Sequence, residues 1–189
     1  MIVCAVRERG KRANMRAIPD RPVPSLRALD NFPAMESAGL LLYKHTPDGL
    51  RVLLGHMGGP FWAGKEAGAW TVPKGGPQPG EQLIDAAVRE FEEEMGGRPS
   101  GPFLELPVVL QRNGKRVHIW AAEGDLDPQA ITSNTFTLEW PPRSGRLREF
   151  PEIDRAAWWT IAEAERLAIA GQGAAFRALE ERLLRGSAR

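Results

Sequence analysis

Two apolar runs, residues 38–46 and 50–57, flank the turn sequence Pro-Asp-Gly, and this pattern predicts a β-hairpin. A short strand is predicted at residues 69–75, ending at Pro73 and the glycines that follow it. Residues 104–124 predict two strands around Asn113-Gly114, a dipeptide typical of tight hairpin turns. Further strands are expected at residues 135–140 and 156–161.

Between these strands, residues 82–95 have the period of an amphipathic helix. The apolar side chains on its predicted buried face are Ile84, Ala87, Val88, Phe91 and Met95. A glycine at 96 or 97 suits its C-terminal cap. Thr160 and Glu163 form a predicted capping box for a second helix, and a last helix is expected over about 174–185. This order of strands and helices predicts an α/β (α+β) domain over residues 35–189.

Residues 1–34 differ from the rest of the chain in composition. They contain seven Lys or Arg and three Asp or Glu, hence a local net charge of +4, and they include four prolines without a sustained apolar period. We expect a poorly ordered basic arm in front of the domain. Because the charges are scattered without interleaved aromatic residues, no specific nucleic-acid partner is expected.

The overall composition indicates a globular protein of the cytoplasm. Cys4 is the single cysteine, which excludes a disulfide or a cysteine cluster within the chain and fits a reducing compartment. The apolar runs are far shorter than the ~20 residues that cross a bilayer, so no membrane partner is expected. At the N-terminus apolar residues precede basic ones, the reverse of a signal peptide, so secretion is not expected.

The helix at residues 82–95 concentrates negative charge. At 100° per residue, Glu90, Glu93 and Glu94 share an arc of about 100° beside the apolar face, whereas Glu92 points to the far side. Arg89 is four residues before Glu93 and can orient its carboxylate. Clustered carboxylates call for a counter-charge, and a hard divalent cation such as Mg2+ or Mn2+ supplies it. The alternative is a solvated acidic face.

Residues 75–97, GGPQPGEQLIDAAVREFEEEMGG, resemble the signature of the Nudix hydrolases. The positions that fit it are Gly75, Glu81, Arg89, Glu90, Phe91, Glu93, Glu94 and Gly96. Gly97 departs from it, because an aliphatic side chain is usual there. The resemblance covers roughly residues 36–170 and implies the Nudix fold, a mixed β-sheet sandwiched between helices.

The resemblance also implies a mechanism, the hydrolysis of a pyrophosphate bond in a nucleoside diphosphate derivative with Mg2+ or Mn2+. Glu90 and Glu94 would be the main metal ligands, and Glu93 a third ligand or the general base. Arg89, together with Glu81, would orient these carboxylates. The base of this family varies, so Glu152 is a second candidate and Glu149 a weaker one.

Substrate contacts are predicted more loosely. Phe61, Trp62 and Trp140 could stack on a nucleobase, or they could belong to the core or to a lid. Lys74 lies next to the signature and could hold phosphates, as could Arg143 and Arg146 in a loop that contains proline and glycine. The three histidines, His45, His56 and His118, show no metal-ligand spacing.

The sequence leaves alternatives open for the substrate, the catalytic role and the oligomeric state. A nucleoside triphosphate or dinucleoside polyphosphate is the favoured substrate, and ADP-ribose or another nucleotide sugar is the alternative. A Nudix fold can also serve as a non-catalytic nucleotide sensor, although such proteins usually lose signature carboxylates that this chain keeps. No P-loop and no calcium-binding loop is present in the sequence. Nudix proteins often form homodimers, and no sequence feature decides this point.

Overall fold

The computed structural model describes residues 36–111 and 114–187. The predicted arm at 1–34 and the predicted turn residue Asn113 lie outside these residues. The predicted first hairpin is confirmed: β1 (Glu36–Thr46) pairs antiparallel with β2 (Gly49–Met57) around Pro47 and Asp48. The glycine that ends this turn has a φ of 109°, which a residue with a side chain rarely adopts.

The main sheet is built around this hairpin. β10 (Ile153–Trp159) pairs antiparallel with β2, and β7 (Arg116–Glu123) pairs parallel with β1, so the sheet is mixed. The short strands β3 (Trp70–Thr71) and β4 (Lys74–Gly75) pair with β2 and β1. Two more short strands, β5 (Leu104–Glu105) and β6 (Val109–Leu110), pair with β7. This pairing brings the loop in front of the acidic helix beside the centre of the sheet.

Three details of the strand prediction are wrong. Residues 69–75 form two strands instead of one, and the strand before Asn113-Gly114 is also divided in two. Pro73 and Pro107 lie between the resulting pieces, and proline lacks the N–H that a continuous ladder needs. The expected loop after Pro142 ends in a strand, β9 (Leu147–Pro151), which pairs with β8 (Thr135–Glu139) as a separate two-stranded ribbon. This pairing depends on a turn in which Arg143 and Gly145 have positive φ angles of 64° and 70°.

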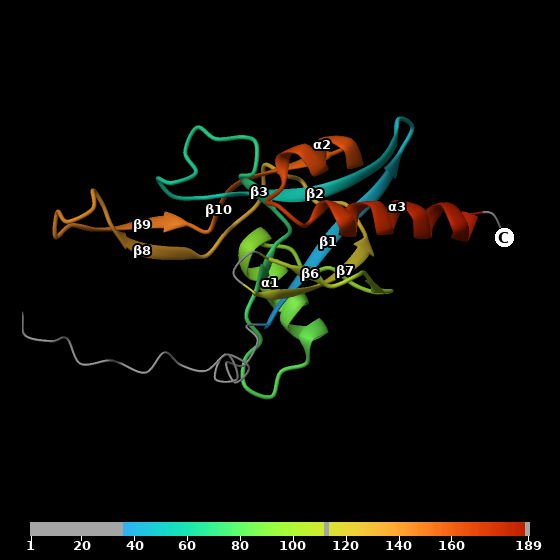
Figure 1. The fold of residues 1–189 in the computed structure, drawn as a ribbon, viewed down its shortest axis with the longest axis horizontal. Coiled ribbons are helices and arrows are strands. Elements are labelled where there is room, and N and C mark those ends of the chain that lie inside the picture. Colours follow the sequence, from blue (N-terminus) through green and yellow to red (C-terminus); the bar gives the residue numbers. More distant parts are fainter. Residues whose placement is uncertain (1–35, 112–113, 188–189) are drawn as a thin grey trace, which may run out of the picture. The chain divides into compact units, whose positions relative to one another are not determined.

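Helices cover both faces of the main sheet, as predicted (Figure 1). Alternate residues of β1 point to opposite faces. Leu40 and Leu42 pack against α1 (Leu83–Met95), whereas Leu41 and Tyr43 face α2 (Ile161–Leu167) and α3 (Gly173–Ser187). The central strand is therefore apolar on both sides, and α1 is held on one face by its own apolar stripe. No helix of the described residues is long and apolar enough to cross a membrane.

The ends of α1 and α2 follow their predicted chemistry. Gly96 caps α1 with a left-handed backbone, φ 77°, and its N–H donates to the Glu92 carbonyl. Thr160 and Glu163 form the capping box at the start of α2. One residue of the predicted buried face differs: Ile84 is half-buried, and Ala86 is buried in its place. Ala86 lies beyond Glu90 around the helix, so the buried arc extends past Glu90 toward Arg89.

Candidate active site

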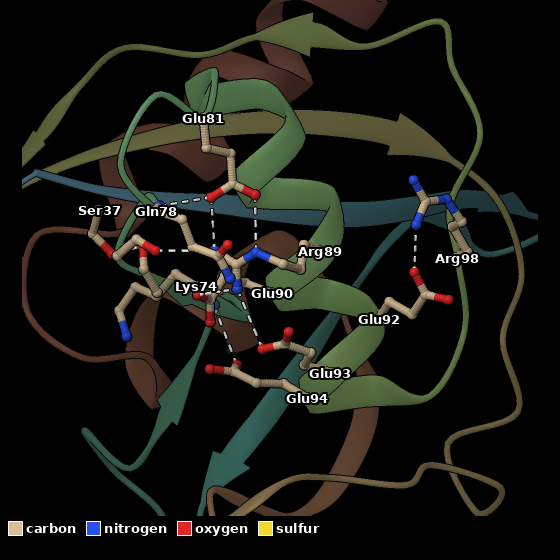
Figure 2. Close-up of polar contacts among 12 residues, drawn as sticks. Ser37, Lys74, Gln78, Glu81, Arg89, Glu90, Glu92, Glu93, Glu94 and Arg98 are labelled. Carbon is tan, nitrogen blue, oxygen red and sulfur yellow. Dashed lines mark hydrogen bonds and ion pairs between the residues drawn. The ribbon is translucent and has the colours of Figure 1, made fainter.

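Arg89 lies at the centre of a polar network that joins α1 to the loop in front of it (Figure 2). Its Nε and Nη2 donate to the two oxygens of Glu81 at 2.9 and 3.0 Å, and Nη2 also donates to the Gly76 carbonyl. The hydrogen bonds from Arg89, followed by one from the Gln78 amide, lower the pKa of Glu81 to about 2. The loop is therefore fixed to the helix by a charged, bidentate contact.

The same guanidinium also holds two of the predicted metal ligands. Nη1 of Arg89 donates to Glu90 at 2.8 Å and to Glu93 at 3.3 Å. Burial raises the pKa of Glu90, Arg89 opposes this rise, and the negative charges of Glu93 and Glu152 add to it. The Glu90 carboxylate lies against the backbone of Gly75, where a Cβ would overlap its oxygens. This contact gives a physical reason for glycine at the first position of the signature.

Glu94 lies deeper than the other acidic residues of α1, with 6% of its surface exposed. One of its oxygens accepts a hydrogen bond from the Lys74 amide at 3.2 Å. Burial is the main cause that raises the pKa of Glu94 to about 8, and the charges of Glu152 and Glu90 add to this effect. Burial also lowers the pKa of the Lys74 ammonium, although the charge of Glu94 opposes that shift. Glu90, Glu94, Glu152 and Lys74 thus form one electrostatic cluster.

Glu92 is separate from this cluster, as the helical geometry predicts. Figure 2 shows its carboxylate turned away from Arg89 toward Arg98, with which it forms an ion pair at 2.5 Å. Both side chains are largely exposed to solvent. An exposed pair of this kind contributes little to stability, which makes Glu92 a suitable internal control for the other glutamates of the helix.

A pocket of about 250 Å3 adjoins the cluster. Its lining includes the charged residues Lys74, Glu94 and Glu152 and the aromatic residues Trp62 and Phe136. The remaining lining residues are Met57, Gly58, Thr71 and Ile153. Sequence reasoning missed Phe136, although strand alternation at 135–140 places it on one face with Leu138 and Trp140. The pocket combines charged groups with aromatic walls, as nucleotide sites do.

The other predicted substrate residues do not line this pocket. Phe61 is 56% exposed and packs edge to face on Trp140, with 5.5 Å between the ring centres. Arg143 and Arg146 are exposed in the turn between β8 and β9. Glu149 is exposed on β9, where it pairs with Thr137. The substrate roles of Phe61, Trp140, Arg143 and Arg146 stay predictions.

The acidic residues of the site offer oxygen ligands, but their carboxylates do not meet at one position. Among the residues that the structure describes, no group of three His, Cys, Asp or Glu side chains is placed to hold a metal ion together. Glu90 and Glu93 instead bond to Arg89, and Glu94 bonds to the Lys74 amide. Even so, their chemistry fits a hard divalent cation, because burial, and after it the charges of neighbouring glutamates, raises the pKa of both Glu90 and Glu94, and a cation would favour their ionised forms.

Comparison with known proteins places this arrangement in a family. The family model described as the NUDIX domain matches residues 36–179, which is most of the chain. The chain belongs to the NUDIX family. A NUDIX domain that keeps the signature residues Arg89, Glu90, Glu93 and Glu94 supports a pyrophosphohydrolase, and the Arg89 network agrees with this class of enzyme.

Solved NUDIX structures share the fold. An Ap4A hydrolase of C. elegans in a binary complex matches with a TM-score of 0.57 and 21% identity, covering 78% of this chain and 98% of that chain. The NUDIX domain of Shewanella oneidensis NrtR, complexed with ADP ribose, matches with a TM-score of 0.56 and 16% identity, covering 85% and 99%. A NUDIX hydrolase structure from Listeria monocytogenes matches with a TM-score of 0.53 and 16% identity, covering 79% and 94%.

The departure of this NUDIX chain from the signature at Gly97 has a structural explanation. A Cβ at position 97 would lie 2.5 Å from Cδ1 of Leu126, a residue of the segment after β7. Leu126 therefore occupies the space that an aliphatic side chain at position 97 would need. The departure concerns packing behind α1 and leaves the polar positions of the signature unchanged.

Proposed function

We propose that this NUDIX protein hydrolyses a pyrophosphate bond in a nucleoside diphosphate derivative and depends on Mg2+ or Mn2+. The observation that carries the proposal is the position of Glu90 and Glu94 on α1, with Glu94 and Glu152 lining a pocket that Trp62 and Phe136 also line. Such a group of carboxylates favours a cation and, through it, the phosphates of a nucleotide.

Glu90 and Glu94 would hold the metal, with Glu93 as a third ligand. When bound, the ion would polarise the phosphoryl oxygens and neutralise the charge that develops on them. Arg89 keeps Glu90 and Glu93 oriented, and it is itself fixed by the bidentate contact with Glu81. Lys74 lines the same pocket as Glu94 and Glu152 and would contact a phosphate oxygen.

Glu152 is the better candidate for the general base. It lines the pocket together with Glu94, and its charge affects the pKa of Glu90, Glu94 and Lys74. Glu93 does not line the pocket, and its side chain is 38% exposed and paired with Arg89. A base must lie within reach of the attacking water, and the position of Glu152 meets this requirement more closely.

The pocket supports a substrate with a nucleobase, held by Trp62 and Phe136. We favour a nucleoside triphosphate or a dinucleoside polyphosphate, with ADP-ribose or another nucleotide sugar as the alternative. The fold is similar to that of an Ap4A hydrolase and to that of a NUDIX domain complexed with ADP ribose. A dinucleoside polyphosphate and ADP-ribose are therefore both suitable test substrates. We further propose action in the cytoplasm, consistent with the single cysteine, and leave a homodimer open.

The deciding experiment is an activity screen with product identification. Purified protein with Mg2+ or Mn2+ is incubated with ATP, diadenosine tetraphosphate and ADP-ribose, and the products are separated by ion-exchange chromatography. We expect turnover of at least one probe, its loss in excess chelator, and a loss of about 100-fold or more in Glu94→Gln but not in Glu92→Gln. Tight binding without turnover of any probe would instead favour a nucleotide sensor.

A further inference from the structure

His56 of β2 is buried, with 1% of its surface exposed, and both of its ring nitrogens are hydrogen-bonded. Nε2 lies 2.7 Å from the Lys65 carbonyl oxygen, and Nδ1 lies 2.7 Å from a carboxylate oxygen of Asp154 on β10. A carbonyl oxygen can only accept, so Nε2 carries a proton and donates it. If Nδ1 lacked a proton, its lone pair would face the Asp154 carboxylate. The ring therefore joins the Asp154 carboxylate on β10 to the Lys65 carbonyl through both of its nitrogens.

Charged and aromatic side chains surround His56. Asp154 is 35% exposed, and the hydrogen bond from the Trp70 indole, followed by those with Arg155, lowers the pKa of the nearby Glu66 carboxyl. Arg155 pairs with Glu66 at 2.6 Å and lies over the ring of Trp70, which packs edge to face on His56. Asp154 and Glu66 thus lie on the same side of the structure as Arg155 and His56, and the ring is held by packing on Trp70 as well as by its hydrogen bonds.

The Lys65 carbonyl belongs to a segment, residues 59–65, that closes on itself. The amides of Trp62 and Ala63 both donate to the Gly59 carbonyl, and the Lys65 amide donates to the Trp62 carbonyl. The Lys65 ammonium also lies over the Trp62 ring. A hydrogen bond that fixes the Lys65 carbonyl therefore fixes the turn that carries Trp62. The indole of Trp62 lines the pocket beside Phe136, Lys74 and Glu152.

We propose that His56 is a positioning residue: anchored by Asp154, it holds the segment 59–65 so that Trp62 forms the wall of the nucleotide pocket. The inference rests on the proposed function in one respect, that Trp62 contacts the nucleotide. His56 itself does not line the pocket, and it acts through the Lys65 carbonyl. Its removal should therefore weaken substrate binding more than it slows the chemical step.

Two substitutions of His56 distinguish the hydrogen bond at Nε2 from the contact at Nδ1. In His56→Gln the amide nitrogen takes the position of Nε2 and can keep the bond to the Lys65 carbonyl. In His56→Asn the amide nitrogen takes the position of Nδ1. This variant keeps the contact with Asp154 and loses the hydrogen bond to the Lys65 carbonyl. Both variants place a neutral amide at the same buried position, so each controls for the general cost of the substitution. His118→Asn on β7, where the ring bonds to Glu36, serves as a remote control.

Hydrogen exchange followed by mass spectrometry on the full chain is the first measurement. We expect exchange of the amides in segment 59–65 to be about tenfold faster in His56→Asn, about threefold faster in His56→Gln, which keeps the Lys65 bond but loses the Asp154 anchor, and near wild type in His118→Asn. If His56→Asn does not fold, the comparison of His56→Asn with His56→Gln is replaced by a comparison of Asp154→Ala with Asp154→Asn. The alanine variant loses the anchor and should exchange faster, whereas the asparagine variant keeps an acceptor and should not. Equal exchange within either pair would overturn the proposal.

Steady-state kinetics are the second measurement, with the probe among ATP, diadenosine tetraphosphate and ADP-ribose that is hydrolysed. KM should rise about tenfold in His56→Asn with kcat changed less than about threefold, and KM should rise less in His56→Gln than in His56→Asn. A loss confined to kcat would contradict a positioning role. If none of the probes is hydrolysed, the proposed function fails, and the exchange comparison still decides the role of His56.

Discussion

The carboxylate of Glu90 lies directly on the backbone of Gly75, in the space that a Cβ at position 75 would occupy. Two residues that are 15 positions apart in the signature are thus in van der Waals contact. Because Arg89 holds the other side of the same carboxylate, Glu90 is confined between a guanidinium and a backbone. Its orientation depends on the absence of a side chain at residue 75.

We expect Gly75→Ala to displace the Glu90 carboxylate and lower kcat/KM about 100-fold, as small misplacements of a catalytic group do. The matched control is Gly76→Ala, because an added Cβ there meets nothing within 4 Å. Activity is measured at saturating Mg2+ and at several lower concentrations, and circular dichroism follows the fold. Wild-type activity and metal dependence in Gly75→Ala would show that Glu90 tolerates the displacement.

We expect Glu152→Gln to lower kcat by about 100-fold or more while leaving metal and substrate affinity close to wild type, since it removes the proposed base and keeps the shape of the side chain. Glu149→Gln is the control, because Glu149 is exposed on β9 and does not line the pocket. Single-turnover kinetics separate the chemical step from binding. A larger loss in Glu93→Gln than in Glu152→Gln would transfer the role of base to the signature helix.

The raised pKa of Glu94 predicts how the stability of the metal-free protein changes with pH. Its folded pKa of about 8 lies above the ordinary 4.5, so its stabilising contribution is complete below pH 4.5 and is lost as the pH rises through about 8. Glu94→Gln mimics the neutral acid. In chelator at about pH 9 it should therefore melt about 3 °C or more above wild type, and near about pH 5 the difference should shrink.

Adding Mg2+ should reverse the order of these melting temperatures, because the wild type gains binding energy that Glu94→Gln cannot. Glu92→Gln, which changes an exposed residue of the same helix, should follow the wild type at every pH. Thermal unfolding followed by circular dichroism measures all three proteins. A Glu94→Gln protein that is less stable than wild type at about pH 9 in chelator would contradict the buried, neutral state of this acid.

The contact of Gly97 with Leu126 predicts a coupled pair. Gly97→Val alone should overpack this site and lower the free energy of unfolding by about 1–3 kcal/mol. In the double variant Gly97→Val with Leu126→Ala, the smaller side chain makes room for the larger one. The double variant should then be more stable than the sum of the single effects by about 1 kcal/mol, measured by urea unfolding. Additive effects would mean that the two positions do not share this space.

The sequence by itself determined the parts of the site that lie close together along the chain. Helical periodicity placed Glu90 and Glu93 on one arc with Arg89 in reach and set Glu92 apart, and Figure 2 shows this division. The hairpin around Pro47-Asp48 and the capping box at Thr160 could also be predicted from the sequence, and both are present. In each case hydrogen bonds or helical geometry act over a few residues, so residue order carries the information.

Only the tertiary structure decided which distant residues complete the site. Glu152 is 58 residues from Glu94 in sequence and reaches it because β10 is paired with β2. Trp62 and Phe136 line one pocket although a turn and a separate ribbon carry them, and Phe61 and Trp140, equally aromatic in sequence, pack on each other outside it. The spacing of residues along the chain does not encode such contacts, because strand pairing and packing across the sheet set them. For the same reason Leu126, and not the signature itself, explains Gly97.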